Sequence, residues 1–168
     1  MIYLLVSIGF IVPSGVHAKT LPVPPIAELT YTEDFILDYV LSKKHLVRDT
    51  TIPMPDLYLQ SVTTLEIFQN SIQDQWGFAP DVITNAYSVS TNRIFLMDDK
   101  SYYDRVGRCI DDSLAHELTH YVQVKYLKWD LADESLEWDA IDIQTQFREE
   151  FCTKGPLHEN SRISEIRH

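Results

Sequence analysis

The spacing of apolar residues in the first third of the chain indicates an α-helix. Between residues 32 and 44, apolar side chains recur three and four positions apart, at Phe35, Ile36, Tyr39 and Val40. This spacing places them on one side of a helix. Thr32 is a favourable N-cap, and Glu33 and Asp34 suit the positive end of the helix dipole. We therefore expect a helix over residues 33–44.

The next segments alternate between strand-like and helical patterns. Residues 52–55 (Ile-Pro-Met-Pro) resist helix, and we expect a short strand at 57–59. A second helix is predicted over residues 63–75, ended by Gly77 and Pro80. Two β-like runs at 86–89 and 93–96 flank the turn residues 90–92, which predicts a hairpin.

Two further helices are expected in the last third of the chain. Asp111, Asp112 and Ser113 can cap a helix that continues to about residue 127. A fourth helix should start near Asp130 or Asp133 and run to about residue 151, before Gly-Pro at 155–156 and a polar tail at 157–168. Helices combined with a small hairpin predict an α+β fold.

The first 18 residues differ from the rest. Residues 2–12 form an apolar run that is shorter than the roughly 20 residues of a bilayer span. Val16 and Ala18 are small residues at the −3 and −1 positions of a cleavage site. We expect a signal peptide at 1–18 and one domain at 19–168 with a Pro-rich start. This predicts a periplasmic or secreted protein without stable membrane insertion, although a retained anchor or a buried first strand stays open.

Charge and cysteine content bear on the possible partners and on the cellular compartment. The formal net charge is −11, with 14 Lys and Arg against 25 Asp and Glu. Nucleic-acid binding requires clustered cations, so we expect no nucleic-acid partner. The acidic balance fits a cationic ligand, or only solubility. Cys109 and Cys152 permit one disulfide if the protein is exported, and otherwise two free thiols.

The segment His116-Glu117-Leu118-Thr119-His120 carries the strongest chemical signal. Residues four apart lie on one face of a helix, so both imidazoles can bind one zinc ion. At 100° per residue, the histidines lie away from the apolar stripe, and we expect them to face away from the core. Glu117 lies beside them, where a carboxylate can take a proton from a zinc-activated water.

A catalytic zinc site needs a third protein ligand, and several acids on the fourth helix compete for this role: Asp133, Glu134, Glu137, Asp139 and Asp142. Residues 114–123 resemble the active-site helix of small gluzincin-like metallopeptidases, whose HELxHxxQ pattern is followed by E-x-x-A on a second helix. Residues 137–140 (Glu-Trp-Asp-Ala) match the second motif. The resemblance covers about residues 85–150 and implies that Glu137 is the third ligand in a minimal zincin-like fold.

These observations give one main hypothesis and one rival. The main hypothesis is a zinc-dependent hydrolase of peptide or protein substrates, in which His116, His120 and Glu137 hold one Zn²⁺ ion and Glu117 is the general base. An oxyanion-stabilising hydroxyl is expected from one of Tyr87, Tyr102, Tyr103 and Tyr121. The resemblance also implies that residues 93–96 form an edge strand beside the site, able to pair with a peptide. The rival is a non-catalytic exported module that binds zinc, with a cysteine ligand, or binds a partner.

Overall fold

The chain has a mixed α+β fold, as expected. The structure, a computed structural model, describes residues 24–152, which form five α-helices and a three-stranded sheet. The predicted signal peptide, residues 19–23 of the Pro-rich start, and the Gly-Pro and polar tail at the C-terminus lie outside the described residues. Within the described part, none of the helices has both the length and the apolar character needed to cross a membrane.

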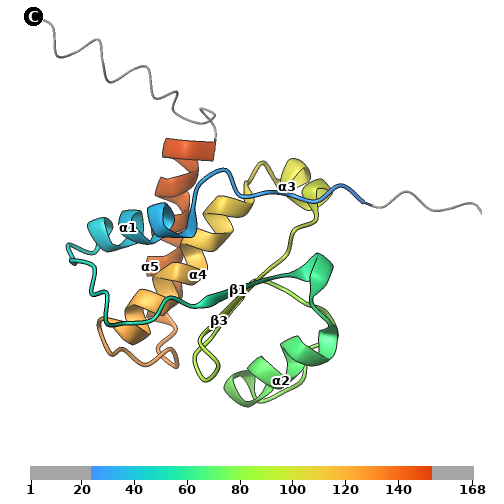
Figure 1. The fold of residues 1–168 in the computed structure, drawn as a ribbon, viewed down its shortest axis with the longest axis horizontal. Coiled ribbons are helices and arrows are strands. Elements are labelled where there is room, and N and C mark those ends of the chain that lie inside the picture. The colour runs from blue at the N-terminus through green and yellow to red at the C-terminus, as the bar shows by residue number, and fades with distance from the viewer. Residues whose placement is uncertain (1–23, 153–168) are drawn as a thin grey trace, which may run out of the picture.

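Helix α4 (Ile110–Lys125) lies at the centre of the fold. It packs against α1 (Glu33–Lys43), α5 (Ser135–Phe147) and the sheet, as Figure 1 shows. Its apolar stripe, including Leu118 and Tyr121, is buried as expected. The opposite face is buried too, with Ser113 and Gln123 fully inaccessible. The histidines lie on the face opposite the apolar stripe, as expected, and the structure adds that α5 packs against that face.

The predicted hairpin is present, but its place in the sheet differs from the expectation. Strand β2 (Ala86–Ser88) pairs antiparallel with β3 (Arg93–Leu96). Strand β1 (Asp56–Leu59) lies parallel along the other side of β3, so the order is β1-β3-β2. The expectation that residues 93–96 form the edge strand is wrong, because β1 occupies that side. The edge strand next to α4 is β2.

The sheet separates two apolar clusters. Ile94 and Leu96 belong to the cluster that contains α1, α4 and α5. The intervening Phe95 packs with Phe68 and Ile72 of helix α2 (Leu65–Trp76) on the other side. This is the alternation expected for a strand buried on both faces. In Figure 1, α2 accordingly lies beyond the sheet from α1, α4 and α5.

The helix starts follow the predicted capping chemistry with small shifts. Thr32 caps α1 as expected, whereas α2 begins at Leu65 with Thr64 as its N-cap, two residues later than the predicted start at 63. The N-cap of α4 is Cys109, which forms a capping box with Asp112. Asp111 instead accepts hydrogen bonds of 2.8 Å from the backbone N–H groups of Thr30 and Tyr31. It thereby attaches the segment before α1 to α4.

Two short elements were not expected from the sequence: the 3₁₀ turn η1 (Gln60–Val62) and helix α3 (Lys100–Val106). The last turn of the predicted fourth helix is the π-helical turn η2 (Arg148–Cys152). Helix α5 begins at Ser135, later than Asp130 or Asp133, and η2 continues it to the predicted end. The disulfide between Cys109 and Cys152 is confirmed, with a sequence separation of 43. It joins η2 to the start of α4.

Candidate metal centre

Helix α4 presents two histidines from successive turns. His116 and His120 are largely buried, each with a side chain 13% exposed, and their Nε2 atoms lie 3.1 Å apart. If one Nε2 carries a proton, it can donate that proton to the other; if neither does, the two lone pairs face each other. A cation between the two nitrogens would stabilise the pair.

Glu137 of α5 completes the arrangement. Its Oε1 lies 3.2 Å from Nε2 of His116, and its Oε2 lies 3.2 Å from Nε2 of His120. The segment between α4 and α5 reverses the chain, and Leu136, Ala140 and Ile143 then bury one side of α5. The structure thus brings together the three predicted ligands. Of the competing acids, Asp133 accepts from the backbone N–H of Ser135, and neither Asp133 nor Glu134 joins the histidines.

The distances among these donor atoms fit a small metal ion. Ligand atoms at about 2.0–2.1 Å from a tetrahedral zinc ion lie roughly 3.3–3.4 Å from one another. The two imidazole nitrogens lie 3.1 Å apart, and each lies 3.2 Å from a different oxygen of Glu137, which is close to that value. Two imidazole nitrogens and one carboxylate also form a donor set that suits zinc and leaves the fourth position open.

The electrostatics of the three side chains are coupled. Burial, and then the neighbouring His120, lower the pKa of His116 to about 4, which favours the neutral form that binds metals. Burial acts the same way on His120, but the hydrogen bond with Glu137 and the nearby Glu117 outweigh it and raise its pKa. The hydrogen bond with His120 lowers the pKa of Glu137, against the opposing effect of burial. Glu137 is therefore held as a carboxylate.

Gln123 fixes the orientation of the second histidine. Its Nε2 donates to the backbone carbonyl of Leu136 (3.0 Å) and to Oδ2 of Asp139 (2.7 Å). Because a carbonyl and a carboxylate can only accept, the amide oxygen of Gln123 faces Nδ1 of His120, 2.9 Å away. The neutral ring of His120 then carries its proton on Nδ1. Its Nε2 either takes a second proton, which it donates to Glu137, or offers its lone pair to a metal ion. In metal-binding histidines, the group that hydrogen-bonds to the ring nitrogen away from the metal sets the tautomer.

Glu117 lies beside the ligands and not among them. It is only 4% exposed, and it lines the same cavity as His120 and Glu137. Burial raises the pKa of Glu117 to about 7, partly offset by His120. A carboxyl group with this pKa can both accept and release a proton near neutral pH.

The cavity in front of the ligands has a volume of about 990 Å³ and an acidic, aromatic lining. Residues of α2, β2, α4 and α5 contribute to it. Its carboxylates are those of Asp74, Glu117, Asp130, Asp133, Glu134 and Glu137, and among the described residues no lysine or arginine lines it. Trp76, Trp129 and Trp138 form parts of its wall, and Trp138 is 72% exposed. The cavity thus favours cationic and apolar groups.

The tyrosines considered for oxyanion stabilisation do not fill that role in this structure. The hydroxyls of Tyr103 and Tyr121 donate to the backbone carbonyls of Met97 and Pro53. Tyr87 lines the cavity, but its hydroxyl donates to Oδ1 of Asn92. Tyr102 meets the ring of Tyr103 edge to face and does not line the cavity. The expected tyrosine donor is therefore not found at the candidate centre.

The cysteines are not positioned to join the three ligands. Cys109, Cys152 and Asp112 form a second group of close donor atoms, but the two sulfurs are bonded to each other. A disulfide sulfur is not a thiolate ligand. Oδ1 of Asp112 accepts two hydrogen bonds from Arg108, at 2.9 and 2.7 Å. Asp112 is thus engaged in capping and ion pairing, and within residues 24–152 it forms no hydrogen bond or ion pair with a histidine of the candidate centre.

Comparisons with known proteins give no neighbour for this chain. No family model, no curated protein and no solved structure matches it. The interpretation of the centre therefore rests on its own geometry.

Two glutamines near the centre were not assigned a role from the sequence. Gln123 follows His120 by three positions, and Gln144 follows Glu137 by seven, so each shares a helix face with a candidate ligand. These spacings indicate that each glutamine lies near a candidate ligand. They do not show which polar atoms of the facing helix each amide contacts.

Proposed function

We propose that this protein is a zinc-dependent hydrolase that acts on peptide bonds. The observation that carries the proposal is the convergence of His116, His120 and Glu137. Their donor atoms lie 3.1–3.2 Å apart, and Glu117 lies beside them at an acidic cavity. A structural zinc site needs four protein ligands and has no use for a buried base next to it.

The protein's own residues supply the remaining parts of the reaction. Zinc held by the three ligands would act as a Lewis acid, lowering the pKa of a bound water to about 7 and polarising the substrate carbonyl. Glu117 accepts a proton from the attacking water and then donates it to the departing amine nitrogen. The raised pKa of Glu117, about 7, suits both transfers. Gln123 holds His120 in the tautomer that keeps Nε2 free.

The surroundings of the centre support a peptide as the substrate. Strand β2 is an edge of the sheet, and its Ala86 and Tyr87 line the cavity. An edge strand can pair with an extended peptide. At this edge the side-chain amide of Gln75 donates to the carbonyl of Tyr87 and accepts from the N–H of Val89, both at 3.0 Å, so a bound peptide would replace these two bonds. The surplus of carboxylates and the exposed Trp138 favour peptides with Lys or Arg near the cleaved bond, since tryptophan faces also attract cations.

Metal content tests the ligand set. The purified chain should bind close to one zinc ion per molecule, and Glu117→Gln should retain it. Glu137→Gln should lose most of it, because one of three ligands becomes a weak neutral donor. Glu134→Gln is the matched control, since this exposed acid lies three positions earlier and does not join the histidines. Full zinc occupancy in Glu137→Gln would overturn the assignment.

Peptide cleavage tests the chemistry. The zinc-loaded wild type should cleave members of a mixed peptide library, and Glu117→Gln, with its zinc intact, should lose at least about 100-fold in rate, as expected when a general base is removed. Bound zinc without cleavage of any peptide would instead support the non-catalytic alternative.

Charge selectivity is tested separately. Asp74→Asn combined with Glu134→Gln should raise KM for Lys- and Arg-containing peptides and leave neutral peptides unchanged. Glu66→Gln, on the same helix as Asp74 but outside the cavity, is the control. An equal rise in KM for neutral peptides would contradict the selectivity.

A further inference from the structure

The two candidate histidines differ in the hydrogen bonding of Nδ1, the ring nitrogen that faces away from Glu137. Nδ1 of His120 lies 2.9 Å from Oε1 of Gln123. Nδ1 of His116 is buried and has no hydrogen-bond partner among the described residues. A buried polar nitrogen without a partner costs free energy, so its surroundings are informative.

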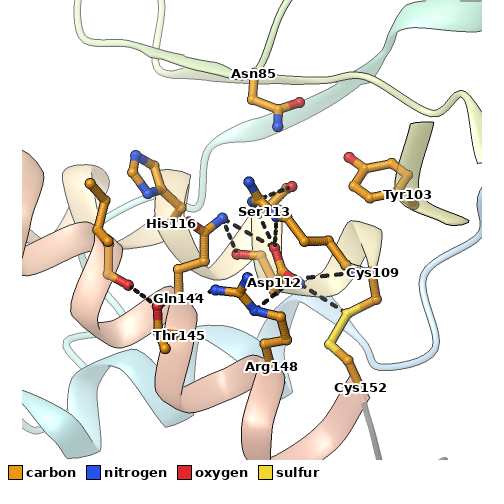
Figure 2. Close-up of polar contacts among 12 residues, drawn as sticks. Asn85, Tyr103, Cys109, Asp112, Ser113, His116, Gln144, Thr145, Arg148 and Cys152 are labelled. Atoms are coloured by element: carbon orange, nitrogen blue, oxygen red, sulfur yellow. Dashed lines mark hydrogen bonds and ion pairs between the residues drawn. A yellow bond between two sulfur atoms is a disulfide. The ribbon is translucent and has the colours of Figure 1, made fainter. Parts of the chain in front are cut away.

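Gln144 of α5 is the side chain beside this nitrogen. Figure 2 shows its amide between the imidazole of His116 and the carboxylate of Asp112. Its Nε2 donates to the backbone carbonyl of Asp112 (3.2 Å) and to Oδ1 of the same residue (3.1 Å). Both acceptors fix the amide in one orientation, because neither can donate. Its Oε1 therefore remains available on the side of His116.

The two glutamines repeat one arrangement in opposite directions. The amide nitrogen of Gln123, on α4, binds a backbone carbonyl and a carboxylate of α5, those of Leu136 and Asp139. The amide nitrogen of Gln144, on α5, binds a backbone carbonyl and a carboxylate of α4, both of Asp112. Each amide is thus anchored on the facing helix, and each oxygen is left toward a histidine of the candidate centre.

We infer that Gln144 is a positioning residue for His116: its Oε1 accepts the proton of Nδ1 and so directs Nε2 toward Glu137 and His120. This inference rests on the proposed function. Each histidine then has a glutamine that accepts its Nδ1 proton: Gln123 of α4 for His120, and Gln144 of α5 for His116. The position of Gln144 is in turn held by Asp112, which Arg108 and Arg148 fix by ion pairs.

Because Gln144 and Gln123 have equivalent roles, replacing either should lower zinc affinity by a similar factor. Gln144→Met keeps the size of the side chain and removes its hydrogen bonds, and it should weaken zinc binding by about 10–100-fold, as does loss of an outer partner elsewhere. Gln123→Met should weaken it by a similar factor. Gln146→Met is the control, because this half-buried glutamine on the same helix donates to Asp142 and, among the described residues, makes no hydrogen bond to a candidate ligand. Zinc affinity would be measured by competition with a chromophoric chelator.

A second variant separates positioning from a purely structural role. Gln144→Glu keeps an acceptor for Nδ1 but loses the donor to Asp112 and places a carboxylate beside it. The unfolding free energy of the metal-free protein should fall, while zinc affinity should stay within a few-fold of the wild type. If Gln144→Met and Gln144→Glu both lower the stability and both leave zinc affinity unchanged, Gln144 only ties the helices together and the inference is wrong.

The wild-type protein gives a test that needs no variant. Long-range ¹H–¹⁵N spectra of the zinc-loaded protein should show His116 protonated at Nδ1, with slow exchange of that proton, and bound to zinc through Nε2. Zinc binding through Nδ1, or fast exchange of that proton, would overturn the inference. If the wild type binds no zinc, the proposed function itself fails. If it binds zinc and Gln144→Met binds it equally well, only the inference on Gln144 fails.

Discussion

Nε2 of His120 lies 3.2 Å from Oε2 of Glu137, and this contact joins the central helix α4 to α5. The two residues are 17 positions apart in the sequence. A metal ion held there would be bound by the folded chain and not by the unfolded one, so metal binding and folding should be linked.

Zinc should therefore stabilise the protein through Glu137. At a free zinc concentration 100 times the dissociation constant, the free energy of unfolding should rise by about 2.7 kcal/mol. A chelator should reverse the gain, and Glu137→Gln should show little of it. Urea unfolding with and without zinc measures the effect. Equal stabilisation of wild type and Glu137→Gln would show that zinc acts elsewhere.

The disulfide between Cys109 and Cys152 should contribute strongly to stability. It closes a loop with a sequence separation of 43, for which loss of the cross-link should cost about 4 kcal/mol. The Cys109→Ser/Cys152→Ser double variant tests this cleanly, because a serine hydroxyl can still cap α4. Adding a reductant should destabilise the wild type and leave the double variant unchanged. A loss below about 1 kcal/mol would contradict the expectation.

Asp111 should make stability depend on pH. Burial raises its pKa above 3.8, although the N–H groups of Tyr31 and Thr30 oppose the shift. The folded state then binds more protons than the unfolded state just above pH 3.8, so this contribution to stability falls as the pH rises through that window. Asp111→Asn keeps an acceptor for both N–H groups and removes the titration. Urea unfolding between pH 4 and 6 should show the variant gaining relative to the wild type as pH rises. A difference that is constant with pH would contradict this assignment.

Phe95 should be essential for the layer formed by α2. Its ring is fully buried and lies 5.1 Å from that of Phe68, measured between centroids. Phe95→Ala should lower the free energy of unfolding by about 3–5 kcal/mol, because it leaves a cavity between sheet and helix. Phe78→Ala is the control, since Phe78 is 60% exposed and its loss should cost at most about 1 kcal/mol. Similar losses for the two variants would contradict the packing.

The features that the sequence predicts correctly depend on interactions between residues a few positions apart. Thr32 starts α1 and Gly77 ends α2, because a side-chain cap and a left-handed residue act within a few positions of the chain. His116 and His120 share a face for the same reason, as helical geometry alone sets a four-residue spacing. The hairpin of β2 and β3 depends on a short turn, and it too was predictable.

Contacts between distant segments decided the rest. The parallel pairing of β1 with β3 made β2 the edge strand, and no local pattern encodes which side of a strand a distant segment will occupy. The burial of the histidine face followed from the packing of α5 on α4. The same packing selected Glu137 over Asp133 and Glu134, and placed the amides of Gln123 and Gln144 opposite carbonyls and carboxylates of the facing helix. The sequence alone thus determined which side chains could bind a metal, while the relative placement of two helices decided which of them meet.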